Sequence, residues 1–383
     1  MPDFALNEDQ LQIQKWVHDF AVDVIRPAGH EWDEREEFPY PIVQQAAEIG
    51  LYGWEFLMNA MGDTSGLTLP VAVEELFWGD AGIGMAIMGS ALAAAGISGN
   101  GTPEQVMEWV PQCYGTPEKI ALGAFCVSEP DAGSDVSSLR TKAVYDQATD
   151  EWVLNGTKAW ITNGGIADVS VVWARTPHGI QGFLVEKGTP GFSTSDLHGK
   201  MSMRASVTSS LAFQDCRISA SHILPQAKGL KAALQCLNQA RYGIGWGVIG
   251  AAIDCYETAR QYCVTRRQFD NKPIASHQLV QEKLAWMVTE ISKAQLLALH
   301  CGRLKDAGRL KPEQVSMLKR HNVAIALECA RISRDLLGAN GIMEDYPVMR
   351  HMANLESVKT YEGTDHIHAL VIGEAVTGIP AYR

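Results

Sequence analysis

The chain has 383 residues, of which 46% are hydrophobic and 20% are charged. That balance is typical of a globular protein and excludes a wholly disordered chain. The formal net charge is −12, the opposite of what a general polyanion binder carries, so nucleic acid is not an expected partner. At about 150 residues per domain, the length predicts two or three domains.

The first residues lack a basic segment followed by an apolar core, so we expect no secretory signal. The longest apolar run, 85–97, is too short for a membrane helix of about 20 residues, and no membrane association is expected. Eight cysteines are scattered without Cys-x-x-Cys spacing. This pattern favours buried free thiols in the cytoplasm over disulfides or a metal site.

Residues 1–120 are predicted to be helical. Asn7 is placed to cap an amphipathic run that we expect to end at Pro27. Further helical patterns cover 41–51, 71–78 and 84–96, and a last helix starts at Pro103.

Residues 121–230 are rich in short runs of β-branched and aromatic residues, which predict an antiparallel β domain. Asn155-Gly156 predicts a tight turn within it. Residues 231–383 contain few Gly or Pro between 274 and 337, and their periodicity indicates a bundle of long helices. The chain is therefore expected to be an α+β protein with helical regions on both sides of a β domain.

Two motifs do not support the ligand that their spacing first suggests. The segment 245–250 matches G-x-G-x-x-G, but no strand precedes it, so close packing inside a helix is favoured over dinucleotide binding. His366 and His368 have a metal-ligand spacing that no further ligand completes. We interpret them as polar helix positions near a ligand.

Three other motifs leave a ligand role and a structural role open. The loop 125–135 could hold an electron-rich ring or a phosphate on its N–H groups and hydroxyls, or be a solvated turn. Trp160 and Thr162 would share one strand face, where a planar isoalloxazine could stack, or Trp160 could be a core residue. Glu362, beside Gly363, could point into an apolar cavity as a base of raised pKa, or be exposed at a helix end.

Together and in order, FCVSEPDAGSD, NGTKAWITN, RRQF, LLGANG and YEGT resemble the acyl-CoA dehydrogenase family over nearly the whole chain. ARYGIGWGVIGA and EGTDHIHAL are most similar to the glutaryl-CoA dehydrogenase branch. The resemblance implies an N-terminal helical bundle (1–120), a central antiparallel β-barrel or sandwich (121–230) and a C-terminal four-helix bundle (231–383). It also implies FAD as cofactor and a homotetramer.

The resemblance assigns the catalytic base to Glu362, which removes the α-proton of an acyl-CoA while the β-hydride passes to the flavin. The backbone N–H of the base helps to polarise the thioester carbonyl. In some branches the base instead precedes the position of Arg241, where this chain has Ala240. The expected product is the trans-2-enoyl-CoA, with electrons passed to electron-transfer flavoprotein. An oxidase, a decarboxylating glutaryl-CoA dehydrogenase and a non-catalytic acyl-CoA or flavin binder are the alternatives.

The resemblance also implies the residues that bind ligands. Ala339 replaces the commoner second Gly, and the order Asp365-His366 is inverted relative to the glutaryl branch. The implied FAD contacts are Phe125, Val127, Ser128, Ser134, Trp160, Thr162, Arg266 (toward a neighbouring subunit's FAD), Gln278, Asp335, Gly338, Ala339, Thr364 and His366. The implied substrate contacts are Ser134, Leu234, Asn238, Arg241, Tyr361, Gly363 and Gly84.

Gly84 occupies the position where the glutaryl branch has an Arg that pairs with the distal carboxylate. No Arg occurs in 36–139, and the nearby acids Glu74, Glu75 and Asp80 have no basic neighbour in sequence. Because a buried unpaired carboxylate costs several kcal/mol, a neutral acyl chain without decarboxylation is predicted. The small residues of 79–89 are expected to leave space for a bulkier, branched or aromatic tail.

Overall fold

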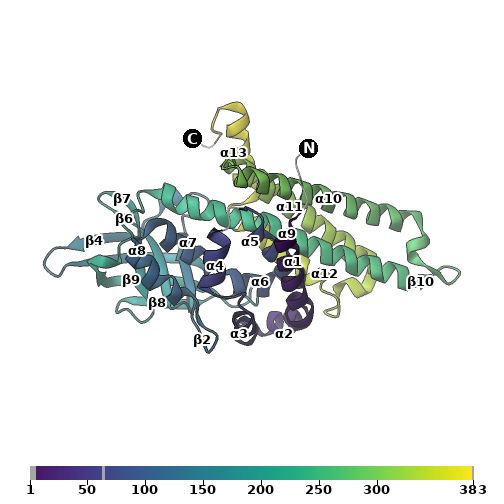
Figure 1. The fold of residues 1–383 in the computed structure, drawn as a ribbon, viewed down its shortest axis with the longest axis horizontal. Coiled ribbons are helices and arrows are strands. Elements are labelled where there is room, and N and C mark those ends of the chain that lie inside the picture. The colour runs from purple at the N-terminus through teal and green to yellow at the C-terminus, as the bar shows by residue number, and fades with distance from the viewer. Residues whose placement is uncertain (1–5, 63–64, 382–383) are drawn as a thin grey trace.

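A computed structural model describes residues 6–62 and 65–381. The β-sheet lies at one end of an elongated molecule, the ends of the long C-terminal helices lie at the other, and the N-terminal helices lie between them (Figure 1). The predicted α+β class, with helices on both sides of a β region in the chain, is confirmed.

The first helix begins as predicted and continues further. The Asn7 side chain accepts a hydrogen bond from the Gln10 N–H at 2.8 Å, and the Gln10 side chain accepts one from the Asn7 N–H at 3.1 Å. The prediction that Pro27 ends the helix is wrong. Helix α1 (Glu8–Phe20) passes through a π-helical turn into α2 (Arg26–Arg35). Pro27 directly follows the π-helical turn, where the regular α-helical hydrogen bonding is already interrupted, so its missing N–H is tolerated.

The remaining N-terminal helices include one long apolar stretch. Ala81–Asn100, broken by a turn at 89–90, spans 20 residues and is apolar enough to cross a membrane by length and composition. This is longer than the sequence interpretation allowed. However, 61% of it is buried, and its second half packs against α9 and β3, as a core element does. The helices are α3 (Tyr40–Glu48), α4 (Trp54–Gly62), α5 (Thr68–Gly79), α6 (Ala81–Met88), α7 (Ala91–Asn100) and α8 (Pro103–Trp109).

The central sheet has seven strands in the order β3-β6-β4-β5-β9-β8, with β7 paired to β6. Most pairs are antiparallel, but β3 and β4 run parallel to β6, which the sequence interpretation did not anticipate. Strands β8 and β9 were not predicted either. The strands are β3 (Gly123–Cys126), β4 (Lys142–Asp146), β5 (Glu151–Thr162), β6 (Val169–Thr176), β7 (Gly179–Glu186), β8 (Phe192–Asp196) and β9 (Thr208–Ser219). Two-residue strands form the small hairpins β1 (Gly115–Thr116) with β2 (Lys119–Ile120), and β10 (Arg267–Gln268) with β11 (Lys272–Pro273).

The predicted turn at Asn155-Gly156 is wrong, because β5 runs straight through it. The register against β9 shifts between Leu154 and Gly156, so the pair forms a bulge. A Cβ at Gly156 would lie 2.5 Å from the Thr141 hydroxyl. Glycine therefore allows a close approach of neighbouring chain here rather than a hairpin.

The C-terminal region consists of long helices around α9, which is about 54 Å long at 1.5 Å per residue. Gly245 and Gly250 lie inside α9, which confirms the packing interpretation. An added Cβ would lie 2.7 Å from Leu318 at Gly245 and 1.8 Å from the Glu74 carbonyl oxygen at Gly250. The helices are α9 (Leu230–Thr265), α10 (Gln278–Asp306), α11 (Pro312–Leu336), α12 (Val348–Thr360) and α13 (Asp365–Thr377).

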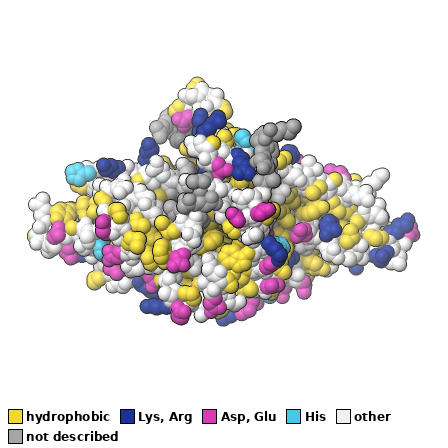
Figure 2. Space-filling model, in the orientation of Figure 1, with side chains coloured by type: hydrophobic (Ala, Val, Ile, Leu, Met, Phe, Trp, Pro, Cys, Tyr) yellow, Lys and Arg dark blue, Asp and Glu magenta, His cyan; other side chains and the backbone are white. Residues whose placement is uncertain are grey.

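All eight cysteines are free and buried, as the scattered spacing predicted. On the face shown in Figure 2, Lys and Arg are interspersed with Asp and Glu rather than gathered into one broad basic surface.

Candidate active site

Glu362 lies in the short bend between α12 and α13. Its φ is 53°, and that of Gly363 is 87°, so two successive residues have the left-handed conformation. A Cβ at Gly363 would lie 3.0 Å from His368 Nε2. Thr364 ends the bend by accepting a hydrogen bond from the Ile367 N–H at 3.2 Å, which caps α13. Glycine at 363 therefore satisfies both the backbone conformation and the close contact.

Side chains from three helices bind the carbonyl oxygens of this bend. Lys319 Nζ of α11 donates to the carbonyls of Tyr361 and Gly363, both at 2.8 Å. Arg241 Nε of α9 donates to the Glu362 carbonyl at 2.9 Å, and His368 Nε2 of α13 lies 3.1 Å from the same oxygen. Since a carbonyl only accepts, His368 carries its proton on Nε2. Burial lowers the pKa of His368 to about 4, which keeps the imidazole neutral.

The Glu362 carboxyl is placed to titrate near neutrality. Its Oε2 is buried and has no hydrogen-bond partner among the described residues. Burial raises the pKa of Glu362 to about 7, while the positive charges of Arg241 and Lys319 oppose that rise. A carboxyl with this pKa is a usable general base at physiological pH. The interpretation of Glu362 as an exposed helix-end residue is therefore disfavoured.

The predicted substrate residues of α9 lie beside this bend. Leu234, Asn238 and Arg241 follow one another at helical spacing, and Asn238 Oδ1 accepts from Arg241 Nη1 at 3.1 Å. Through Arg241, Asn238 joins Tyr361, Glu362 and Gly363 in one site. The structure thus brings together five of the predicted catalytic and substrate residues.

The loop 125–135 and the end of β5 also come together. The Ala159 N–H donates to the Ser128 carbonyl at 3.0 Å. Lys158 Nζ donates to the Val127 carbonyl at 3.1 Å and pairs with Glu129 at 2.9 Å. Lys158 and Glu129 were not identified from the sequence. A lysine flanked by small residues in a strand was the only signal, and it does not reveal a partner 29 residues away.

Trp160 presents a large flat ring beside this loop. Its side chain is 68% exposed, and its φ is 61°, so packing within the chain does not explain its position. Phe125 and Val127 are buried, Thr162 is half-buried, and the loop residue Ser134 is exposed. An exposed indole next to a loop that carries hydroxyls fits a planar ring system such as a flavin. A core role for Trp160 is excluded.

The other predicted FAD residues lie elsewhere. Figure 1 shows β10, which follows Arg266, at the end of the molecule opposite the sheet. One chain therefore does not bring these residues to Trp160. His366, in α13, is exposed and Thr364 half-buried. The separate set, all exposed, is Arg266, Gln278, Asp335, Gly338 and Ala339.

The expected space around Gly84 is filled. A Cβ at Gly84 would lie 2.9 Å from the ring of Phe77, which is fully buried. A Cβ added at Gly79 would lie 2.8 Å from the Ile25 side chain. A Cβ added at Gly89 would lie 2.9 Å from the Asn163 side chain. The expectation of an open region for a bulky tail, drawn from these small residues, is therefore wrong.

Two of the acids near Gly84, which have no basic neighbour in sequence, contact basic residues from distant parts of the chain. Arg350 of α12 donates to Asp80 Oδ2 at 2.7 Å, and His18 Nδ1 lies 2.8 Å from Glu75 Oε2. Both partners are distant in sequence. Glu74 is buried, and burial raises its pKa to about 8, so it is mainly neutral at pH 7.

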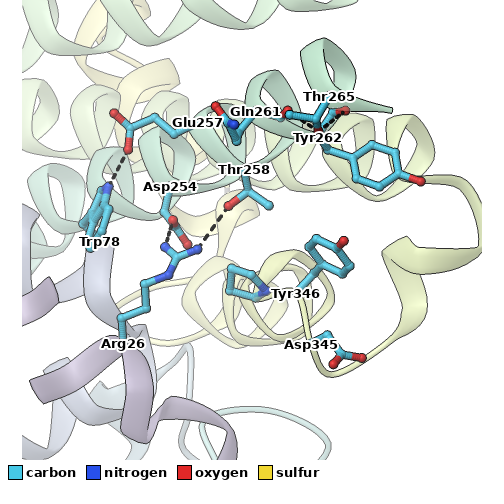
Figure 3. Close-up of a pocket in the computed structure, with 11 residues that line it drawn as sticks. Arg26, Trp78, Asp254, Glu257, Thr258, Gln261, Tyr262, Thr265, Asp345 and Tyr346 are labelled. Atoms are coloured by element: carbon cyan, nitrogen blue, oxygen red, sulfur yellow. Dashed lines mark hydrogen bonds and ion pairs between the residues drawn. The ribbon is translucent and has the colours of Figure 1, made fainter. Parts of the chain in front are cut away.

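A separate cavity of about 440 Å³ lies between α2, the second half of α9 and the segment before α12 (Figure 3). Arg26 points at Asp254 and Thr258, with an ion pair to the first and a hydrogen bond of 3.2 Å to the second. The indole N–H of Trp78 donates to Glu257 at 3.0 Å. None of the predicted site residues lines this cavity, and its charges hold helices together.

Curated relatives match over nearly the full length. The chain is 35% identical to acryloyl-CoA reductase (NADH) of Anaerotignum propionicum, covering 98% of this chain and 96% of that protein. It is 33% identical to mitochondrial isobutyryl-CoA dehydrogenase of Dictyostelium discoideum, covering 98% and 91%.

Solved structures share the fold. Glutaryl-CoA dehydrogenase from Mycobacterium smegmatis has a TM-score of 0.93 and 46% identity, covering 99% of this chain and 97% of that one. A glutaryl-CoA dehydrogenase from the same organism in complex with FADH2 has a TM-score of 0.93 and 42% identity at the same coverage. The structure described as electron transferring flavoprotein of Acidaminococcus fermentans has a TM-score of 0.91 and 32% identity, covering 98% and 100%.

Three domain profiles cover the chain in order. The N-terminal, middle and C-terminal domains of acyl-CoA dehydrogenase match residues 7–115, 124–216 and 227–377. The fold, the bend at Glu362 that is bound from three helices, and the exposed ring of Trp160 agree with this match. The chain belongs to the acyl-CoA dehydrogenase family and is an FAD-dependent oxidoreductase that acts on acyl-CoA.

Proposed function

We propose that this enzyme dehydrogenates the α,β-bond of an acyl-CoA with a neutral acyl chain, with Glu362 as the base. The observation that carries the proposal is the Glu362 carboxyl. It is buried on one oxygen, has no hydrogen-bond partner there among the described residues, and lies on a bend bound from three helices.

The bend supplies both a base and a donor. Once ionised, the Glu362 carboxylate accepts the α-proton of the thioester. The hydrogen bonds formed by the described residues do not engage the Glu362 backbone N–H. It is thus available to donate to the thioester carbonyl oxygen, where negative charge develops as the proton leaves. Arg241 and Lys319 add positive charge to the same region.

FAD supplies the acceptor for the β-hydride when bound. Residues of this chain that would hold its ring system lie on the loop after β3 and at the end of β5. Trp160 offers the exposed flat face, and Ser128 lies against the strand through the Ala159 N–H. The further residues of this set are Phe125, Val127, Ser134 and Thr162.

The cations near Gly84 and Glu362 already bind other groups, which supports a substrate with a neutral tail. Arg350, the basic residue that reaches the Gly84 helix from the C-terminal region, is already paired with buried Asp80. Arg241 is bound to the Glu362 carbonyl and Asn238, and Lys319 to two carbonyls. A second substrate carboxylate would have to break one of these pairs or remain unpaired, and either is costly.

The test is a panel of acyl-CoAs in an electron-acceptor assay. Butyryl-, isobutyryl-, hexanoyl- and 3-phenylpropanoyl-CoA are compared with glutaryl-CoA, with CO2 measured in parallel. We expect a neutral substrate to have the highest kcat/KM, and glutaryl-CoA to be turned over poorly without CO2. Glutaryl-CoA as the best substrate, with CO2 evolved, would overturn the neutral-tail proposal.

We also propose electron-transfer flavoprotein as the electron acceptor. One solved structure with the same fold is described as an electron transferring flavoprotein, and this link between the fold and that electron carrier supports the proposal. The oxidase alternative predicts peroxide in air without any added acceptor. We expect turnover to depend on added flavoprotein, and peroxide at a matching rate in its absence would contradict the proposal.

The separation of the two FAD residue sets supports an oligomer of identical chains. A second copy could bring its exposed Arg266 set to the Trp160 surface of the first. The exposed apolar side chains of α10, Leu279 (79%), Val288 (42%) and Leu296 (54%), are suited to cover by a neighbour. We expect a tetramer in light scattering. Mixing Trp160→Ala and Arg266→Ala chains should restore some intact FAD sites, and a monomer with full FAD content would refute the arrangement.

A further inference from the structure

Lys319, a buried lysine of α11, contacts the bend that carries Glu362. We propose that Lys319 is a positioning residue, which fixes the backbone around Glu362 and provides the positive charge against which that carboxylate ionises. This inference rests on the proposed role of Glu362 as the base.

Lys319 binds the backbone on both sides of Glu362. Its Nζ donates at 2.8 Å to the carbonyl of Tyr361, the residue before Glu362, and at 2.8 Å to that of Gly363, the residue after it. These two carbonyls flank the stretch in which Glu362 and Gly363 have positive φ. Lys319 therefore stabilises the left-handed conformation that directs the carboxylate.

The charge of Lys319 is not neutralised by a contacting acid. Lys319 is 1% exposed, and the salt bridges among the described residues do not include it. The acids whose charges act on Lys319 are Glu362 and Asp365, and Asp365 is paired with Arg320 at 3.2 Å. Because a buried unpaired charge is costly, the positive charge of Lys319 lowers the cost of ionising Glu362 beside it.

Groups from every element packed around the bend set its titration. Arg241 and Cys236 face it from α9, Lys319 from α11, and His368 and Asp365 from α13, with Tyr361 adjacent. His368 and Cys236 are neutral near pH 7, because burial lowers the pKa of the first and raises that of the second. Arg241 and Lys319 are the cations that oppose the burial of the Glu362 charge. Loss of the Lys319 charge therefore raises the pKa of Glu362 further.

The experiment compares Lys319→Met with Arg331→Met in the FAD-loaded enzyme. Methionine keeps the length of the side chain and removes its charge. Arg331 lies on the same helix, is about half exposed and pairs with Glu328 and Glu356, which are not among the groups around the bend, so its variant controls for a change in net charge alone. The rate of anaerobic flavin bleaching by butyryl-CoA, or by the best substrate of the panel, is measured from pH 5 to 9. Exchange of the substrate α-protons in D2O gives a second readout.

We expect Lys319→Met to move the acid limb of both profiles up by about one pH unit, the effect of losing a nearby opposite charge. Arg331→Met should leave the limb where it is. A role in folding alone would lower the rate at every pH without moving the midpoint, and that result would overturn the proposal.

Glu362→Gln separates failure of this inference from failure of the proposed function. If Glu362→Gln retains both bleaching and exchange, the base has been misassigned and the proposed function fails. If Glu362→Gln abolishes both while the Lys319→Met midpoint is unchanged, only the role of Lys319 fails. Lys319→Gln serves as a second neutral variant. Failure of both neutral variants to fold would assign Lys319 to the architecture and also overturn the proposal.

Discussion

Lys158 in β5 and Lys319 in α11 are both almost fully buried, at 0% and 1% exposed, and both bind backbone carbonyls. They differ in their acidic partners. Lys158 contacts the Glu129 carboxylate at 2.9 Å, and that carboxylate also accepts from the N–H groups of Arg140 and Thr141. Lys319 contacts carbonyls, and the acid that acts most strongly on its charge is Glu362.

The difference indicates what each charge does. Burial raises the pKa of Glu129, but hydrogen bonds from Thr141, Arg140 and Lys158 outweigh it, so the net pKa is lowered and the pair remains ionised. This ion pair between Lys158 and Glu129 holds the loop 125–135 to β5. Lys319 leaves its charge open to a group that changes protonation during the reaction. Lys158 therefore stabilises local structure, whereas Lys319 affects the ionisation of the proposed catalytic base.

The largest expected effect tests the chemical side of this comparison. Glu362→Gln keeps the shape of the side chain but cannot accept a proton, so flavin bleaching by acyl-CoA should fall by about 10²–10⁴-fold. FAD content should be unchanged. Glu356→Gln in α12, which affects an exposed pair with Arg331, is the matched control. Comparable bleaching by both variants would place the base elsewhere.

On the structural side, Lys158→Met would leave the buried Glu129 carboxylate without its cation. We expect the free energy of unfolding to fall by about 3–5 kcal/mol, as measured by denaturant titration. The pH midpoint of flavin bleaching should not move. Adding Glu129→Gln should recover part of the loss because the unpaired charge is removed. A shifted pH midpoint in Lys158→Met would contradict the division between the two lysines.

The stability of the Glu362 site should depend on pH. Because burial raises the folded-state pKa of Glu362 to about 7 from an ordinary value of 4.5, the folded state binds more protons between these pH values. Stability therefore falls as pH rises through this window. Glu362→Gln removes that fall, so its stability relative to the parent should increase between pH 4.5 and 7, by roughly 1–3 kcal/mol. Parallel stability curves for the two proteins would show that Glu362 is not buried as described.

The smallest expected effect concerns the indole near Lys158. Trp160→Gly removes an exposed ring and relieves a positive φ, so the apoprotein should melt at the same or a higher temperature. Loss of a stacking contact worth about 1.4 kcal/mol would raise the FAD dissociation constant about tenfold. Fluorescence titration with FAD measures it. Unchanged FAD affinity would remove Trp160 from the flavin site.

Much of the fold was predictable because its signals are local. The capping residue Asn7, the helix that begins at Pro103 and the periodicity of the long C-terminal helices each depend on residues within a few positions. The errors arose where distant contacts decide local structure. Asn155-Gly156 became a bulge because β5 pairs with strands on both sides.

The sequence by itself determined the order of the motifs, the identity of the acid at 362 and the glycine beside it. Only the tertiary structure decided what surrounds that acid. Lys319 is 42 residues from Tyr361, and Arg350 is 270 residues from Asp80. Charge interactions depend on distance in space and on burial, and neither can be obtained from spacing along the chain. The choice between an exposed glutamate and a poised base was therefore made by the packing of α9, α11 and α13 around the bend.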